Sequence, residues 1–298
     1  LVIFLAFARP HTACTSNSVV PDQFPTIQAA IDAGADTILV RPGQYPETPL
    51  AREPLVLMAI SADPSAQPLL AGLRLHINRP STFPPIYTFN NIGVSGQVLI
   101  VNDRGLVDIT FANCSLRGGV ADSSSLVDTG NITISRTHLE GTALLLARGY
   151  VRLDSCHVSG HLVAQGEPTL VVTSCTFEGA GSGNGISTRG RINAAEIVGN
   201  VIRSYEVGVN VYADGVNIAE NTVADCVRAG IAVDAGTAIV EGNTVERCVN
   251  GLIVGSTGCG VWGNRIVAAR DNGIELTGEN HNVASNVVWG CGGDGIPL

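Results

Sequence analysis

The sequence predicts an all-β solenoid, and three observations carry that prediction. First, asparagines recur at intervals of 21 and 22 residues, at Asn200, Asn221, Asn243, Asn264 and Asn286. Second, one apolar residue stands three positions before each asparagine, and another stands two positions after it. Third, a glycine that opens an apolar alternation follows each asparagine by eight or nine residues. Self-similarity of this period indicates stacked repeats that bury their apolar side chains against one another.

The same register continues upstream, so that nine consecutive repeats share both apolar columns. There the asparagine column is occupied by Cys114, Thr137, Cys156 and Cys175. A leucine-rich repeat is the main alternative, but in the last four repeats the upstream apolar position that it needs holds alanine, serine or glycine. Short β-branched strands with no connecting helix favour a single-stranded right-handed parallel β-helix of about eleven coils. Each coil would contain 21–22 residues.

Residues 1–19 are predicted to be the remnant of a signal peptide and a leader. They begin with an apolar run ending in Ala6-Phe7-Ala8, which is typical of a secretory signal with a small-x-small cleavage site. A first buried strand is the alternative. We therefore expect a secreted, periplasmic or cell-surface protein whose β-helix domain spans residues 20–298. No other segment is long and apolar enough for a transmembrane helix.

Residues 24–34 are predicted to form an N-terminal cap. Pro25 and Thr26 can start a short helix, its apolar stripe follows, and Gly34 can end it. The first coil of a solenoid exposes unpaired strand edges and an apolar interior. A capping helix would cover both and prevent end-to-end association.

The recurring asparagine is expected to be architectural. Asparagine tolerates the left-handed backbone that a sharp corner between strands requires. Coils stack about 4.8 Å apart, so each side-chain amide can donate to one neighbour and accept from the other. Such a ladder would satisfy amides that are costly to bury alone. The pairs Asn250-Gly251, Asn272-Gly273 and Asp294-Gly295 are also expected to form corners.

The eight cysteines suggest stacked thiols more than a disulfide framework. Cys156 and Cys175 occupy one column in neighbouring coils, and Cys226 and Cys248 share another. This spacing permits disulfides. Parallel stacked side chains need not reach the required torsion, so we favour free, buried thiols. No C-x-x-C pair is present, and no metal site is predicted.

The stretch "PTIQAAIDAGADTILVRPGQYPE", followed by glycine- and asparagine-bearing coils, resembles the pectin-lyase-like superfamily of right-handed β-helices. The resemblance covers roughly residues 20–298. It implies the fold, and as an activity it implies a polysaccharide lyase, glycoside hydrolase or epimerase. Calcium would be the expected cofactor of a lyase. No other cofactor is evident.

Enzymes of that superfamily carry acidic and basic residues on one outward sheet face. The corresponding column here is Ser187, Asn210, Ala232, Ile253 and Glu275, which contains a single carboxylate. Glycoside hydrolysis normally needs two carboxylates close together.

The densest polar stretch, "ARDNGIELTGENHN", supplies the candidate catalytic residues Arg270, Asp271, Glu275 and His281. Net charge is −9 and every one of the 17 basic residues is arginine, which argues against a nucleic-acid partner. We expect a rigid surface that binds an extracellular polysaccharide or a cell-surface glycan. A carbohydrate-active enzyme is the alternative.

Overall fold

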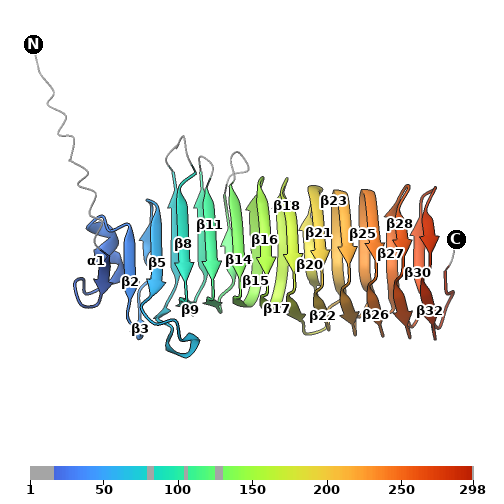
Figure 1. Ribbon diagram of the computed structural model, residues 1–298, viewed down its shortest axis with the longest axis horizontal. Helices are drawn as coiled ribbons and strands as arrows, with labels where there is room; N and C mark the ends of the chain where they lie inside the picture. Colours follow the sequence, from blue (N-terminus) through green and yellow to red (C-terminus); the bar gives the residue numbers. More distant parts are fainter. Residues whose placement is uncertain (1–16, 79–83, 104–106, 125–129, 297–298) are drawn as a thin grey trace, which may run out of the picture.

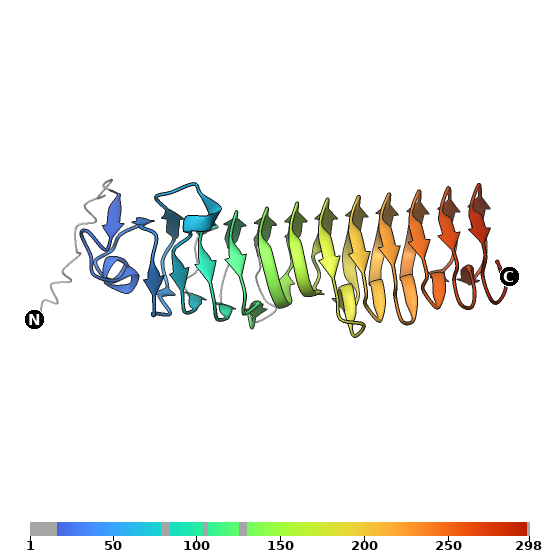
Figure 2. The same ribbon diagram turned by 90° about the horizontal axis from the view of Figure 1, so that it is seen from below.

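The computed structural model describes residues 17–78, 84–103, 107–124 and 130–296. They form a single elongated parallel β-solenoid with the cap at one end and the last coil at the other (Figure 1). The view from below shows the coils as successive, nearly equal windings (Figure 2). There are about twelve turns. This agrees with the sequence-based prediction of about eleven coils.

Three ladders of parallel strands run along the solenoid. The first ladder, which precedes the asparagine corner, comprises β1 (Ser18–Val20), β2 (Thr37–Val40), β5 (Leu55–Ala59), β8 (Ile86–Asn90), β11 (Asp108–Ala112), β14 (Asn131–Ser135), β16 (Tyr150–Asp154), β18 (Thr169–Thr173), β21 (Ile192–Val198), the second halves of β23 (Val207–Ala219) and β25 (Ala229–Glu241), β28 (Gly260–Trp262) and β31 (Asn282–Ala284).

The second ladder follows the asparagine corner and consists of shorter strands. It comprises β3 (Gln44–Tyr45), β6 (Leu69–Leu70), β9 (Gly93–Val94), β12 (Ser115–Leu116), the first parts of β15 (His138–Ala147) and β17 (His157–Gly166), β19 (Thr176–Glu178), β22 (Val201–Arg203), β24 (Thr222–Ala224), β26 (Thr244–Glu246), β29 (Arg265–Val267) and β32 (Val287–Trp289).

The third ladder closes each coil. It comprises β4 (Leu50–Ala51), β7 (Leu73–Ile77), β10 (Val98–Asn102), β13 (Val120–Asp122), the second parts of β15 and β17, β20 (Asn184–Arg189), the first halves of β23 and β25, β27 (Asn250–Ser256) and β30 (Ile274–Thr277). Alternate side chains of all three ladders point inward, and the apolar columns seen in the sequence form the core. Ile197, Ile218, Val240 and Val261 are fully buried.

The N-terminal helix α1 (Ile27–Asp32) covers the first coil, next to β1 and β2 (Figure 1). The Thr26 hydroxyl caps it by accepting the Ala29 N–H at 3.0 Å. The Glu47 carboxylate accepts the Ile27 and Gln28 N–H groups at 2.8 and 3.0 Å and so ties the helix to the solenoid. The η1 turn (Pro64–Ala66) is the other helical segment described. No helix in the described ranges is long and apolar enough to span a membrane.

The predicted asparagine ladder is present. The side-chain amide of Asn221 donates to the Asn243 Oδ1 at 2.9 Å, and that of Asn243 donates to the Asn264 Oδ1 at 3.0 Å. Each Oδ1 also accepts the backbone N–H of the preceding asparagine, as Asn243 does from Asn221 at 3.0 Å. Upstream, Asn200 Oδ1 accepts the Cys175 N–H at 2.9 Å, so the column begins before the first asparagine.

The left-handed residue at this corner is not the asparagine, which corrects the expectation from the sequence. It is the residue before: Gly199, Glu220, Gly242 and Gly263 have φ of 68°, 57°, 62° and 65°. The asparagine side chain is needed instead for its buried hydrogen bonds. A second left-handed column lies four residues after the asparagine, at Ser204, Asp225, Arg247 and Ala268, with φ between 54° and 61°.

Of the three pairs expected at corners, Asn272-Gly273 lies at a bend directly before β30 and Asp294-Gly295 lies at a bend after β32, but Asn250-Gly251 does not form a corner. Asn250 and Gly251 lie inside β27, and the glycine is required because the coils approach closely there. A Cβ at Gly251 would lie 2.3 Å from the Gly273 carbonyl oxygen, and one at Gly230 would lie 2.9 Å from that of Gly251. The column therefore accommodates only glycine.

The expectation of free thiols is confirmed for the described cysteines, from Cys114 to Cys291. Six of the seven are buried, and burial raises the pKa of the Cys114 thiol to about 11. Cys14 lies outside the described residues, as do residues 1–16 of the predicted leader. The first paired strand, β1, begins at Ser18, just before the predicted boundary at residue 20.

Candidate functional site

The outward column predicted from the sequence lies on the third ladder. Ser187 pairs with Asn210, Ala232 with Ile253, and Ile253 with Glu275 in neighbouring coils. At the upstream end of this column, next to Ser187, lies an open groove of about 330 Å³, which we call the His161 groove. It is lined by Thr142, His161, Val163, Asn184, Ser187, Thr188 and Arg189.

Three neighbouring strands bring these residues together. Thr142 of β15 is in register with His161 of β17, and Val163 of β17 is in register with Ser187 of β20. β15 and β17 run without a break from the second ladder into the third. Every second residue of such a strand points to the same face, so these outward side chains form one continuous row.

The imidazole of His161 is fixed by its surroundings. Its Nδ1 lies 2.9 Å from the Asn184 carbonyl oxygen, so Nδ1 carries a proton and donates it to that bond. In the neutral ring, Nε2 is then left with a free lone pair. Gly183 lies against the ring edge, where a Cβ would be 2.5 Å from Cε1.

Tyr205 supports His161 from beneath. It is fully buried, and its ring meets the imidazole edge-on with the ring centroids 5.8 Å apart. Its hydroxyl donates to the Gly160 carbonyl at 2.6 Å, which anchors the residue before His161. Desolvation raises the pKa of the Tyr205 phenol, so the hydroxyl stays a donor.

Arg189 closes one end of the groove and makes no ion pair with any described residue. Its neighbour Arg191 instead pairs with Asp214 and lies over the Tyr212 ring, with Cζ 5.1 Å from the centroid. The Ser187 hydroxyl is already engaged, since it donates to the Leu162 carbonyl at 3.2 Å. The groups open to a ligand therefore include the Arg189 guanidinium, the His161 Nε2 and the Thr142 hydroxyl.

Two more imidazoles lie on the same outward row. His138 and His157 stack in adjacent coils, with ring centroids 4.9 Å apart and planes inclined by 11°. His138 Nε2 lies 3.1 Å from Glu140 Oε1. The residues that line the groove itself include neither aspartate nor glutamate. The groove can thus hydrogen-bond a polar ligand, but it lacks the carboxylate pair that glycoside hydrolysis normally uses.

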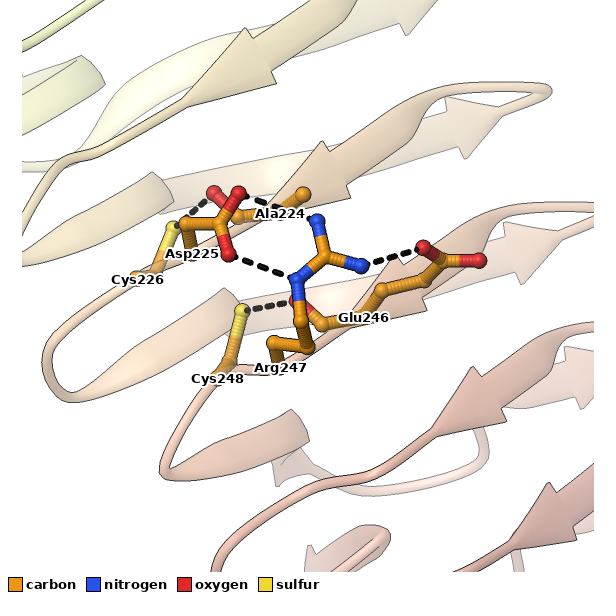
Figure 3. A network of polar contacts seen from close by, with 6 residues as sticks. All are labelled: Ala224, Asp225, Cys226, Glu246, Arg247 and Cys248. Carbon is orange, nitrogen blue, oxygen red and sulfur yellow. Dashed lines mark hydrogen bonds and ion pairs between the residues drawn. The ribbon is translucent and has the colours of Figure 1, made fainter.

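A second polar cluster occupies an exposed corner (Figure 3). Arg247 donates to both carboxylate oxygens of Asp225, at 2.7 and 3.0 Å, and to Glu246 at 2.8 Å. The hydrogen bond from Arg247 lowers the pKa of Asp225, so this carboxylate stays ionised. The thiols of Cys226 and Cys248 lie beside the network and donate to the Ala224 and Glu246 carbonyls (Figure 3). These groups satisfy one another and tie two corners together.

The four candidates chosen from the sequence lie on three segments of the last coils. Arg270 and Asp271 follow β29 at a corner, and Glu275 points outward from β30 beside Ile253. His281 precedes β31, and both of its ring nitrogens are buried without a hydrogen-bond partner. Among the described residues, no group of three or more histidine, cysteine, aspartate or glutamate side chains is arranged to hold a metal ion.

The sequence contained a signal for the residues that were missed. His138 and His157 are separated by 19 residues, as are Thr137 and Cys156 in the ladder column, so both histidines fall in one column. His161 follows His157 by four residues and shares its face by strand alternation. Arg189 follows Ser187 by two residues and shares the face of the predicted outward column.

Comparison with known proteins agrees with this architecture. Residues 144–298, just over half of the chain, match the family described as the right handed beta helix region. The protein belongs to this right-handed β-helix family, consistent with the pectin-lyase-like fold. No curated protein and no solved structure matches the chain.

Proposed function

We propose that the protein is an exported β-helix protein that binds extracellular carbohydrate, a polysaccharide or a cell-surface glycan, through the His161 groove. The observation that carries the proposal is an open groove with uncommitted polar groups, among them those of Thr142, His161 and Arg189. Donors and acceptors placed along an open groove suit a polyhydroxylated ligand. Their fixed positions on paired strands reduce the ordering cost of binding.

The groove favours binding over catalysis because no carboxylate lines it. A lyase, hydrolase or epimerase activity is the alternative class. It would require a base and an acid, and His161 Nε2 is the best-placed base in this groove. Activity assays therefore belong in the same experiment, with and without calcium.

The test is a polysaccharide panel scored for retained binding, new reducing ends and ultraviolet-absorbing unsaturated products. We expect binding without turnover, and we expect His161→Ala and Arg189→Ala each to weaken it roughly tenfold through the loss of a hydrogen bond to a charged or polar group. His76→Ala and Arg265→Ala, which remove the same side chains elsewhere, should change it less than about twofold. Reproducible turnover, or equal effects of all four variants, would contradict the proposal.

Export is tested separately by fusing residues 1–19 to an alkaline phosphatase that is active only outside the cytoplasm. We expect phosphatase activity in intact cells, because the apolar run has the length and the small-x-small ending of a signal. Replacing residues in that run by arginine should abolish the activity. An inactive unaltered fusion would contradict export by this segment.

A further inference from the structure

A second groove lies on a different ladder from the His161 groove. It runs over the outward side of β25, β28 and β31 and has an open volume of about 390 Å³. It is lined by Val216, Thr237, Ala238, Ile239, Gly258, Cys259, Gly260, Trp262 and Asn282. We call it the Trp262 groove.

Its main feature is an indole held in a fixed position. Trp262 and Gly260 alternate on one face of β28, and the indole folds back over the glycine. A Cβ at residue 260 would lie 2.0 Å from Cζ3 and 2.1 Å from Cη2 of this ring. Glycine is therefore what allows the ring to lie against the strand.

The indole is also tied to the neighbouring coil. Its Nε1 donates to the Glu241 Oε2 at 2.6 Å, and Glu241 stands beside Trp262 in the ladder. A side chain packed on backbone and held by a charge-assisted hydrogen bond has lost its rotamer freedom before a ligand arrives. The ring is a preformed aromatic platform.

In the outward column next to this platform, two asparagines flank an isoleucine and a glycine. Gly260 is in register with Ile239 of the preceding coil and with Asn282 of the following coil. Ile239 is 42% exposed. Asn217 lies one coil further, in register with Ile239.

We propose that the Trp262 groove is a second carbohydrate-binding site, specific for uncharged sugar rings. A pyranose presents one face of C–H groups, which packs on an aromatic ring, and an edge of hydroxyls, which suits Glu241 and Asn282. The Glu241 carboxylate beside the ring disfavours acidic sugars by like-charge repulsion. One aromatic side chain does not make the cage that recognises a quaternary ammonium.

The groove crosses four coils, from Val216 of β23 to Asn282 of β31. With coils about 4.8 Å apart, it extends roughly 14 Å along the solenoid axis. A glycan chain lying parallel to that axis would pass one residue of the same outward column at each coil. This orientation is a property of the stacked fold, because only there do equivalent positions repeat at strand spacing.

The test uses intrinsic fluorescence, because the chain has only two tryptophans. In a Trp289→Phe protein the signal comes from Trp262 alone. We expect neutral hexasaccharides of β-1,4-linked glucose, xylose or mannose to quench or shift it saturably, and galacturonate hexasaccharide and choline to have no effect. In calorimetric titrations of variants of the natural chain, Trp262→Ala should weaken binding at least about fivefold.

Matched variants separate this site from general effects. Trp289→Ala removes an indole that is 69% exposed on β32 and should change affinity less than about twofold. Glu241→Gln keeps an acceptor for the indole N–H and should bind nearly as well, whereas Glu241→Ala should bind worse. His161→Ala should leave neutral-sugar quenching of Trp262 unchanged, which keeps the two grooves distinguishable.

The proposal is overturned if no neutral hexasaccharide perturbs Trp262 at millimolar concentration. It is equally overturned if Trp262→Ala and Trp289→Ala weaken binding alike, or if choline perturbs Trp262 and the sugars do not. The last result would identify a cation site.

Discussion

At the scale of single residues, the asparagine column shows how a buried side-chain amide, which is costly to desolvate, can stabilise the fold. Asn243 is completely buried, yet its amide donates to Ile218, Glu241 and Asn264 and its oxygen accepts twice from Asn221. A lone buried amide would pay its full desolvation cost. In the column this cost is offset, because the side-chain amide of each asparagine donates a hydrogen bond to the Oδ1 of the asparagine in the next coil.

Asn243→Ala should therefore be strongly destabilising. It removes an acceptor from two buried N–H groups of Asn221 and leaves the Ile218 carbonyl without the amide. We expect a loss of about 3–5 kcal/mol in the free energy of unfolding, measured by urea denaturation. Asn250→Ala, at a less buried position, is the matched control and should lose less than about 1.5 kcal/mol. Equal losses would show that the ladder is not what makes Asn243 important.

The corner ion pair predicts a modest pH dependence. Arg247 lowers the folded-state pKa of Asp225, so the pair's stabilisation is present above the unfolded-state pKa of about 3.9 and is lost as the pH falls through the lower folded value. Both side chains are about half exposed, at 44% and 53%, so screening limits the contribution.

We expect Asp225→Asn to lower the free energy of unfolding by less than about 1 kcal/mol at pH 7, and to leave it unchanged at a pH below the lowered pKa of Asp225. Asparagine also tolerates the left-handed backbone at this position, so the difference reports the charge. The measurement is denaturant unfolding of both proteins at several pH values, repeated in 1 M salt, where the difference at pH 7 should shrink. A difference that grows as the pH falls would have the wrong sign for this pair.

At the scale of elements, the close approach of successive coils decides which residues a strand can hold. The strand β25 contains Gly230, where a Cβ would lie 2.3 Å from Val245 Cγ1. The strand β23 contains Gly215, where the nearest atom would be 4.0 Å away and the backbone is not left-handed. Only Gly230 belongs to the glycine column that follows each asparagine, and the two glycines meet different neighbours.

Gly230→Ala should therefore lower the free energy of unfolding by about 2 kcal/mol or more, because neither the neighbouring backbone nor the packed valine can move away. Gly215→Ala should be neutral or stabilise by up to about 1 kcal/mol, since alanine reduces the freedom of the unfolded chain. Thermal and urea unfolding of both variants would check the contrast. If Gly230→Ala is as stable as Gly215→Ala, the coils are not packed as tightly as described.

The same scale explains which parts of the fold and of the sites were predictable. The glycine and asparagine columns were recoverable from spacing, because a repeat places the same position in the same environment in every coil. The left-handed positions were not recoverable, because Glu220 and Ala268 carry no local preference for that backbone. The hydrogen bonds of the neighbouring coils hold them there. The indole platform of Trp262 depends on Glu241 and Gly260, and spacing does not show that contact.

At the scale of the whole molecule, the solenoid should behave as a chain of nearest neighbours. Each coil contacts the coil before it and the coil after it, and the ladder bonds link adjacent asparagines. In such a molecule, substitutions in adjacent coils share partners, whereas those several coils apart do not.

A double-mutant cycle tests this view. Asn221→Ala combined with Asn243→Ala should deviate from additivity by about 1–3 kcal/mol, because the first substitution already breaks a bond that the second would break. Asn200→Ala combined with Asn264→Ala, three rungs apart, should be additive within about 0.5 kcal/mol. Coupling of similar size in both cycles would indicate a single cooperative core in place of neighbour-to-neighbour stacking.

The sequence by itself determined the period, the stacking columns and the buried amide ladder. It could do so because a repeating chain encodes its own alignment, and alignment fixes which residues face inward. Only the tertiary structure decided where the backbone turns left-handed, which glycines are crowded, and how His161, Arg189, Glu241 and Trp262 stand beside their neighbours. Those outcomes depend on atoms contributed by adjacent coils, about twenty residues away in the chain and about 4.8 Å away in space.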